Sequence, residues 1–469
     1  MKRFITLLLP CLLSLPWSAS AAEKPNILVI VADDMGYADC GVQGCKDVAT
    51  PSIDSLARNG VRFTNGYVSG CVCSPSRAGI ITGRYQQRCG HDANPKGQFG
   101  LDLKETTMAQ RMKAAGYVAG ITGKWHLGEE KEQMPLSRGF DEFYGILPHG
   151  IAAEKKGSGV QVYRGWDKVE TPSDHTVKFG EEAGAFIERH KSEPWFLYLP
   201  FTAVHAPHVA PESYVQKFAH IEDKGRRQLC AMISVMDDRI GAVLAKLREL
   251  KLEERTLIFF ISDNGGPQSR TVHNGPLRGG KWTVWEGGIR VPFMVQWKGH
   301  VAPGRVLDTP VIALDILPTA LAAAKVDVSL RETNSATNLS RSERTTLAET
   351  ALDGVNLLPL LEGKTDKLAR EALFWRFGVQ FAVRQGDWKL VKASRDMQPA
   401  LFNLATDIGE KSDLAAQQPD KVKQLAALWE SWNARNIPPR WEDQRWNGLE
   451  EKAANKRAKK QGRRNSATK

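Results

Sequence analysis

Two polar pairs follow directly on apolar runs, one near the start of the chain and one past its middle. Asp33-Asp34 comes after Asn26–Ala32, and Asp263-Asn264 comes after Thr256–Ser262. Carboxylate and amide oxygens are the ligands that Ca²⁺ and Mg²⁺ prefer in proteins. Either pair alone indicates a turn, but buried and unpaired carboxylates are costly, so the two pairs together favour a bound cation. Zinc is disfavoured because no cluster of Cys and His accompanies them.

A cysteine stands at the start of a predicted helix. The segment reads Cys73-Ser74-Pro75-Ser76-Arg77, in which Ser74 is a good helix cap and Pro75 suits the first helical position. The partial positive charge of a helix N-terminus favours an anion or a nucleophile at Cys73. A buried structural cysteine, or one half of a disulfide, is the alternative. The segment by itself leaves the two interpretations about even.

The polar residues lie at the ends of short apolar runs, which are expected to be strands. Besides the two runs above, Tyr117–Thr122 leads to Lys124 and His126, and Trp195–Leu199 leads toward His205. Continuous apolar runs of this length are typical of strands buried on both faces of a parallel sheet. Ligands bind beyond the carboxyl ends of such strands. Four strand ends are therefore expected to bring these side chains to one site.

Helical stretches alternate with these strands, and a second region follows them. Thr107–Ala115 and Gly225–Leu250 have helical patterns, so the alternation predicts a doubly wound α/β domain. Further on, three short strands, a hairpin turn at Gly386-Asp387 and one helix indicate a smaller α+β domain. The predicted strands and helix of that domain are Ala372–Trp375, Gln380–Arg384, Trp388–Lys392 and Pro419–Asn433. The predicted organisation is a leader at 1–22, a catalytic domain at 23–360, the small domain at 361–445 and a basic tail at 446–469.

The pattern Cys73-x-Pro75-Ser76-Arg77, followed by Thr82-Gly83, resembles the signature of the formylglycine-dependent sulfatases of the alkaline phosphatase superfamily. Further resembling segments extend over nearly the whole mature chain: Pro25–Tyr37, Thr50–Ala57, Gly116–His126, Pro276–Pro292 and Leu401–Leu404. The chain departs from the family pattern at Ala119, Thr122 and Trp282, and Trp282 stands where Gly often follows the Lys. The resemblance implies an alkaline-phosphatase-like α/β fold, with a doubly wound mixed sheet and a smaller C-terminal α+β domain. It is nearest the branch of arylsulfatases and N-acetylgalactosamine-6-sulfatases.

The resemblance also implies a modified residue and a metal. In that family a maturation enzyme oxidises the signature cysteine to formylglycine (3-oxoalanine), whose hydrate is the nucleophile. Here that residue would be Cys73. The implied metal is Ca²⁺, ahead of Mg²⁺. Its ligands would be Asp33, Asp34, Asp263, Asn264 and the converted Cys73.

Further roles carry over to basic residues. Positive charge for the sulfate oxygens would come from Arg77, Lys124 and Lys281. His126 would be the base that regenerates the aldehyde, and His205, with Lys281, would protonate the leaving alcohol. Weaker assignments as substrate contacts fall on His91, Asn94 and His208.

These residues together predict a sulfuric ester hydrolase that acts on a sulfated carbohydrate or an aryl sulfate. One alternative is a phosphonate monoester or phosphodiester hydrolase, which would use the same nucleophile, cation and oxygen contacts. Another is a glycan-binding relative without catalysis. Trp282 and Trp285 could stack on a sugar ring, although partly buried packing is the commoner role of Trp.

The net charge of +11 is concentrated at the two ends of the chain. Residues 1–22 carry +2 and residues 451–469 carry +7, which leaves +2 for residues 23–450. A nearly neutral body argues against a nucleic-acid-binding surface. With 42% apolar and 25% charged residues, the composition is that of a globular protein rather than a disordered or coiled-coil one. The basic tail indicates a solvated extension, and adhesion to an anionic polymer is the alternative.

The N-terminal segment has the pattern of a secretory signal. A short basic start precedes the apolar run Phe4–Trp17, and Ala19-Ser20-Ala21 supplies a small-residue cleavage site. The run is too short to span a membrane comfortably, and no later segment is long and apolar enough. We therefore expect a periplasmic or secreted protein without a membrane span.

An exported chain can form disulfides, but the pairing of its cysteines is left open. The cysteines concerned are Cys40, Cys45, Cys71, Cys89 and Cys230.

Overall fold

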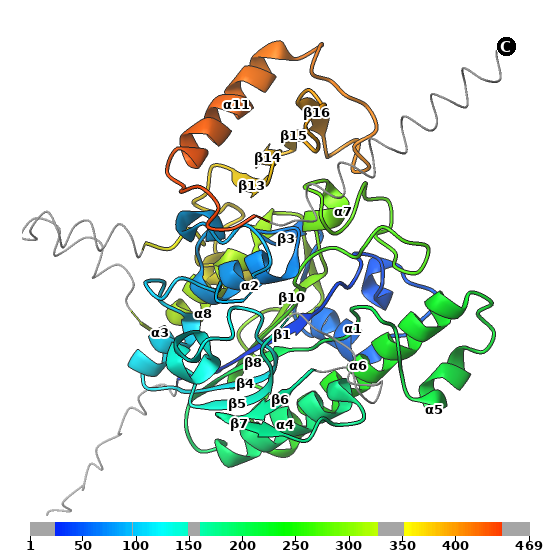
Figure 1. Ribbon diagram of the computed structural model, residues 1–469, viewed down its shortest axis with the longest axis vertical. Helices are drawn as coiled ribbons and strands as arrows, with labels where there is room; N and C mark the ends of the chain where they lie inside the picture. The colour runs from blue at the N-terminus through cyan, green and yellow to red at the C-terminus, as the bar shows by residue number, and fades with distance from the viewer. Residues whose placement is uncertain (1–23, 96, 149–159, 327–350, 443–469) are drawn as a thin grey trace, which may run out of the picture.

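Ten strands form one mixed sheet that runs through the larger part of the molecule (Figure 1). The structure is a computed structural model that describes residues 24–95, 97–148, 160–326 and 351–442. The strands are β1 (Asn26–Ala32), β2 (Val61–Phe63), β4 (Val118–Lys124), β5 (Glu142–Ile146), β6 (Val162–Arg164), β7 (Asp167–Val169), β8 (Trp195–Pro200), β9 (Thr256–Ser262), β10 (Phe293–Gln296) and β11 (Arg305–Leu307). Their order across the sheet is β11-β2-β10-β9-β1-β8-β4-β5-β6-β7.

The middle of the sheet is parallel, and its margins are mixed. β9, β1, β8, β4 and β5 are parallel neighbours, as the long apolar runs predicted. β10 pairs antiparallel with both β9 and β2, and β5, β6 and β7 are joined by antiparallel pairing. The sequence did not predict β2, β6, β7 and β10, because each has only three or four residues and too few positions to show a period.

The central strand β1 is buried on both faces, and its side chains alternate between two cores. Ile27, Val29 and Val31 belong to one apolar cluster, and Leu28 and Ile30 belong to the other. This alternation follows from the two-residue period of a strand. A strand with helices on both faces needs apolar residues at every position, which explains its continuous apolar run.

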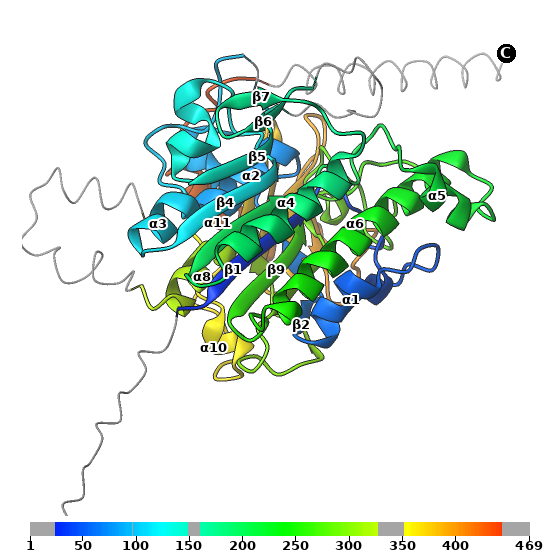
Figure 2. The same cartoon turned by 90° about the horizontal axis from the view of Figure 1, so that it is seen from below.

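Helices cover both faces of the sheet. On one face lie α2 (Cys73–Thr82), α3 (Met108–Ala114), α8 (Ile316–Ala323) and the short α10 (Leu358–Leu361). On the other lie α1 (Pro51–Arg58), α4 (His175–Arg189) and α6 (Lys224–Glu249), with the one-turn α5 (Glu212–Val215) beside α6. Figure 2 shows α4 and α6 side by side across the sheet. The predicted doubly wound α/β architecture is confirmed.

A second, antiparallel sheet carries the C-terminal part of the described chain. Its strands, in spatial order, are β13 (Leu373–Phe377), β14 (Gln380–Gln385), β15 (Trp388–Lys392) and β16 (Ala400–Asn403). The helix α11 (Pro419–Asn433) packs on one face through Leu425, and it has the bounds that the sequence predicted. The other face packs against the larger part of the molecule (Figure 1). β16 was not predicted as a strand.

Three further elements are short. β3 (Gly66–Tyr67) and β12 (Val311–Ile312) form a two-stranded sheet, and the single turn α7 (Glu286–Ile289) follows the Lys281 loop. Within the described residues, no helix is long and apolar enough to cross a membrane. The predicted leader at 1–22 and the basic tail at 446–469 lie outside the described residues.

Candidate active site

The polar residues that follow four parallel strands meet at one edge of the sheet. β9, β1, β8 and β4 are consecutive neighbours, so their carboxyl ends lie side by side. The turns after them are tied together by backbone hydrogen bonds, since Asp33 N–H donates to Ala203 O (2.8 Å) and Asp263 N–H donates to Ala32 O (2.9 Å). The sheet edge therefore brings together the residues that the sequence placed at separate strand ends.

The predicted metal ligands are in mutual contact. Asn264 Nδ2 donates to Asp34 Oδ1 (2.8 Å), and Asp34 N–H donates to Asp263 Oδ1 (3.1 Å). One ligand atom each of Asp33, Asp34, Cys73 and His205 lies within 4.8 Å of the others. Asp34 has a φ of 63°, an unusual conformation for a non-glycine residue and one that recurs at functional sites.

Cys73 is the first residue of α2, and its sulfur faces the carboxylates. Its Sγ lies 3.5 Å from Asp33 Oδ1, 3.8 Å from Asp34 Oδ1 and 3.1 Å from Lys281 Nζ. Burial raises the pKa of the Cys73 thiol, and the nearby Lys124 and Lys281 ammonium groups do not offset this effect. The helix N-terminus is therefore present as predicted, but it does not make the thiol acidic.

The predicted capping role of Ser74 is wrong. The residue before α2 is Val72, whose carbonyl accepts from Ser76 N–H (3.2 Å), and Ser74 lies inside the first turn. The Ser74 hydroxyl is used elsewhere, because it donates to His126 O (2.6 Å) and contacts His91 Nε2 (2.6 Å). A local pattern could not reveal these two distant partners.

Three buried cations surround the carboxylates. Lys124 Nζ donates to Asp33 Oδ2 (2.6 Å), and Lys281 Nζ lies 2.6 Å from Asp34 Oδ1. Arg77 is fully buried, and its Nε and Nη2 both donate to Asp263 Oδ2 (2.9 and 2.7 Å). Burial by itself would raise the pKa of Asp33, but the charges of Lys124 and Arg77 outweigh it and hold that pKa far below its usual range.

This donor set fits a hard divalent cation. The three carboxylates are balanced by three cations, so the six side chains carry no net formal charge. A divalent ion would add +2 and make the site attractive to an anion. Asn264 Oδ1 is buried and has no hydrogen-bond partner among the described residues, which leaves an amide oxygen available for coordination.

His126 is placed by the strand next to it. Trp125 N–H and His126 N–H donate to Ile146 O and Leu147 O (2.9 Å each), at the end of β5. His126 is 2% exposed and has a φ of 59°, again in the left-handed region. Its carbonyl accepts from Ser74, so the His126 backbone is tied directly to the helix that carries Cys73.

His91 and Asn94 support the start of α2. Asn94 Oδ1 accepts from Ser74 N–H (3.0 Å). The Ser74 hydroxyl gives its proton to His126 O, so it must accept from His91, whose Nε2 therefore carries hydrogen. His91 is fully buried, and this burial lowers its pKa to about 3. These contacts make both residues neighbours of the nucleophile segment; their predicted contact with substrate stays a prediction.

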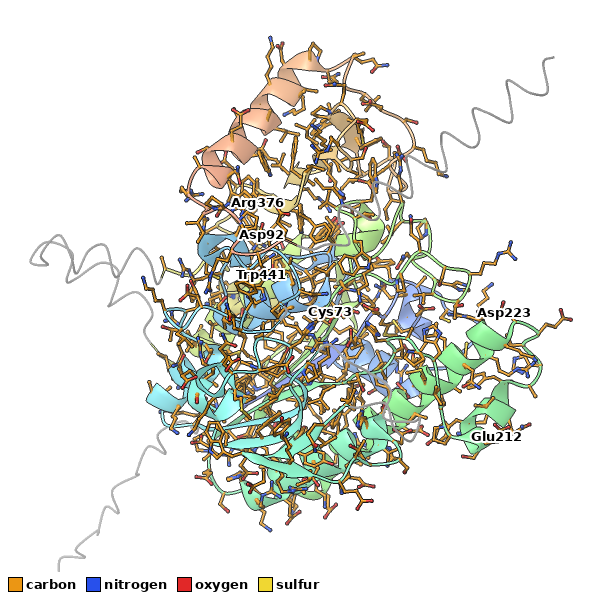
Figure 3. The ribbon with its side chains drawn as sticks, viewed as in Figure 1. Cys73, Asp92, Glu212, Asp223, Arg376 and Trp441 are labelled. Atoms are coloured by element: carbon orange, nitrogen blue, oxygen red, sulfur yellow. The ribbon has the colours of Figure 1, made fainter. Side chains whose placement is uncertain are left out.

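A C-terminal segment, which we call the strap (434–442), packs over His91 and Asn94. Trp441 Nε1 donates to the carbonyls of Ala93 and Asn94 (3.2 and 3.1 Å). The Trp441 ring meets His91 edge-on, with centroids 4.8 Å apart. Arg376 holds the same region through both oxygens of Asp92 (2.8 and 3.0 Å), and Figure 3 shows these residues close to the Cys73 helix. Sequence reasoning missed the strap, because about 350 residues separate Trp441 from its partners.

We expect Trp441→Ala to lower kcat about tenfold with KM within about twofold, because a displaced His91–Ser74 pair shifts Cys73 and His126 together. Loss of a buried Trp should also cost about 3 kcal/mol of stability. Steady-state kinetics below the melting temperature checks this. Trp441→Phe should restore most of kcat, and the exposed Trp166→Ala is the control. A raised KM with normal kcat would contradict the positioning role.

His205 and His208 lie on the loop after β8. His205 Nε2 is 3.6 Å from Asp34 Oδ2, and its side chain is 23% exposed, which makes it accessible from solvent. Its Nδ1 donates to Ala206 O (2.6 Å). Burial lowers the pKa of both His205 and His208. His208 is half-buried, and none of its described contacts assigns it a role.

Two glycine pairs let the Lys281 loop approach the carboxylates. Gly265 N–H donates to Gly288 O (3.1 Å), and a Cβ on Gly265 would lie 1.8 Å from Gly287 O. Any side chain here would push α7 away from Asp263-Asn264. The Asn-Gly-Gly and Glu-Gly-Gly triplets in the sequence were the available signal, because paired glycines often mark close backbone approach.

The comparisons with known proteins agree with this geometry. The sulfatase family model matches residues 25–326. The chain is 33% identical to human N-acetylgalactosamine-6-sulfatase over 402 residues, covering 79% of this chain and 72% of that protein. It is 32% identical to bovine arylsulfatase A over 490 residues, covering 90% and 91%.

Solved structures share the fold of this chain. The crystal structure of Ps i-CgsB in complex with k-i-k-neocarrahexaose matches with a TM-score of 0.81 and 30% identity, over 91% of this chain and 96% of that one. The phosphonate monoester hydrolase of Agrobacterium radiobacter matches with a TM-score of 0.64 and 21% identity, over 88% and 96%, and shares the fold. The chain therefore belongs to the sulfatase family and is a sulfuric ester hydrolase.

Proposed function

We propose that this enzyme hydrolyses sulfate esters of sulfated glycans, with a formylglycine made from Cys73 as the nucleophile and a calcium ion beside it. The observation that carries the proposal is the position of Cys73 Sγ, 3.1 Å from Lys281 Nζ and 3.5 Å from Asp33 Oδ1. An oxygen nucleophile in place of that sulfur would stand between a cation and the carboxylates that would hold the metal.

The metal would be held by oxygens of Asp33, Asp34, Asp263 and Asn264. When bound, Ca²⁺ would polarise a sulfate oxygen and favour the ionised nucleophile. The three carboxylates and the amide are all oxygen donors, which favours Ca²⁺ ahead of Mg²⁺ and zinc.

The three buried cations, Arg77, Lys124 and Lys281, have different roles at the site. Arg77 has its donors on Asp263 and on Lys124 O, so it orients the carboxylates. Lys124 and Lys281 each contact one carboxylate and can also donate to sulfate oxygens. Their fixed positions stabilise the charge that develops as the sulfur–oxygen bond breaks.

Two histidines would move protons. His126 is tied to the Cys73 helix through Ser74, which suits a base in the last step. His126 would take the proton from the remaining hydroxyl of the sulfated hydrate while the C–O bond to the sulfate breaks, so that sulfate leaves and the aldehyde is regenerated. His205 is partly exposed, and its Nε2 and Lys281 Nζ both lie near Asp34 Oδ2 (3.6 and 2.8 Å), so a leaving alcohol there could receive a proton from protonated His205 or from Lys281.

The glycan substrate is supported by two relatives. One carries the name N-acetylgalactosamine-6-sulfatase, and the other was crystallised with a neocarrahexaose. We propose a sulfated sugar residue as the substrate here, with aryl sulfates as smaller substrates.

We also propose, from the signal-like residues 1–22, that the chain is exported to the periplasm or secreted.

Mass spectrometry of the peptide that spans Cys73 tests the nucleophile. After coexpression with a formylglycine-generating enzyme, we expect an aldehyde in place of the thiol, in proportion to specific activity. An active enzyme with an unmodified thiol would contradict the proposal.

The competing reaction is tested by kcat/KM for matched aryl sulfate and aryl phosphonate esters. We expect at least about a 100-fold preference for sulfate, and a preference for phosphonate would overturn the proposal.

A further inference from the structure

Trp282, directly after Lys281, has a backbone conformation that is rare for a large side chain. Its φ is 75°, in the left-handed region that favours glycine. The loop is held by Trp282 N–H donating to Cys71 O (2.9 Å) and by Gln380 Nε2 donating to Trp282 O (3.0 Å). A strained residue that its surroundings hold in place is a mark of functional sites.

This conformation places the indole next to the reacting atoms. Lys281 Nζ lies over the Trp282 ring, 5.8 Å from its centroid, and the same Nζ is 3.1 Å from Cys73 Sγ. Trp282 is only partly buried, unlike Lys281. A sulfate held by Lys281 would therefore carry its ester group beside the indole.

The smaller sheet supports the indole. The ring of Phe377, at the end of β13, lies 6.0 Å from the Trp282 ring at 49°, and Phe377 is buried. Gln380, at the start of β14, bonds to Trp282 O and accepts from Val284 N–H (3.2 Å). The β13–β14 hairpin thus positions Trp282, although it contributes no residue to the metal site.

We propose that Trp282 is a specificity-determining residue that stacks on the apolar face of the pyranose ring bearing the sulfate. The proposal rests on the proposed glycan sulfatase function. A pyranose ring has C–H groups on its faces and hydroxyl groups around its edge, so a flat, partly exposed indole matches the face. Binding pockets combine such aromatic surfaces with a few polar groups, which here are the sulfate-binding cations.

The test compares the wild type with Trp282→Gly and Trp282→Phe. Gly adopts positive φ without strain, so the loop and Lys281 should keep their positions. Substrates are monosulfated galactoses and N-acetylgalactosamines, and inorganic sulfate serves as an inhibitor without a sugar ring. We expect Trp282→Gly to raise KM about tenfold, with kcat and the inhibition constant of sulfate within about twofold, and Trp282→Phe to recover part of the loss. The remote Trp166→Ala should change neither constant.

Each other outcome has a distinct meaning. An unchanged KM in Trp282→Gly, with active wild type, would overturn the stacking role alone. A parallel rise in the sulfate inhibition constant would place the effect on Lys281 and would also overturn it. If the wild type hydrolyses aryl sulfates but no sulfated pyranose, the proposed glycan function fails, and the stacking role fails with it.

Discussion

Replacing Cys73 with Ala is expected to reduce turnover by on the order of 10⁴-fold or more while the fold is retained. The residue supplies the proposed nucleophile, and no other described nucleophilic side chain contacts both Asp33 and Lys281. Its sulfur lies at the sheet edge rather than between core side chains, so we expect the melting temperature to fall by a few degrees at most. Initial rates on an aryl sulfate, with circular dichroism, measure both effects.

Cys71→Ala is the matched control for this variant. Cys71 is equally buried and lies two residues away, but its side chain packs in the apolar cluster beneath the smaller sheet. Removing its sulfur should cost stability without changing kcat by more than about twofold. Wild-type turnover in Cys73→Ala would show that the nucleophile is another group.

Removing calcium is expected to give the second large effect. After treatment with a chelator, activity should fall at least about 100-fold, since a bound metal contributes several kcal/mol to stabilising charge in the transition state. Ca²⁺ should restore it at lower concentration than Mg²⁺. Thermal unfolding gives an independent readout, because a ligand at 100 times its dissociation constant stabilises the folded state by about 2.7 kcal/mol.

The variant Asn264→Ala tests the proposed metal site without removing any of the ion pairs around it. The substitution removes one of the proposed oxygen ligands but leaves Lys124–Asp33, Lys281–Asp34 and Arg77–Asp263 intact. We expect calcium affinity to fall at least about tenfold. Metal-free stability should fall by about 1–3 kcal/mol, because the buried Asn264 amide no longer donates to Asp34 Oδ1 and Gly265 O. Asn26→Ala, a buried amide at the opposite end of β1, should keep the calcium response. A wild type that neither binds calcium in the thermal assay nor loses activity to the chelator would refute the metal assignment.

Most of the central architecture could be predicted from local patterns. The run Ile27–Ala32 is apolar at every position because helices cover both faces of β1, and the buried pair Asp33-Asp34 follows at the carboxyl end of that strand. Both ends of the helix Pro419–Asn433 could also be predicted to the exact residue. Its first residue is Pro, which favours a helix start, and the helix is several turns long. Short strands outside the parallel centre of the sheet, such as β6 and β10, have too few residues to show a period.

The residue types of the site were determined by the sequence, because a hard cation and a sulfate group require carboxylates, an amide and fixed cations whatever the details of the fold. The tertiary structure alone decided which partners these residues have. Ser74 forms hydrogen bonds with His91 and His126 rather than capping its helix, and Arg77 donates hydrogen bonds to Asp263. Trp441 and Phe377 reach the site from the smaller sheet and its strap. Such contacts join residues that lie from 17 positions apart, as for Ser74 and His91, to 350 positions apart, as for His91 and Trp441. Only the packing of two sheets selects them from the many that local propensity allows.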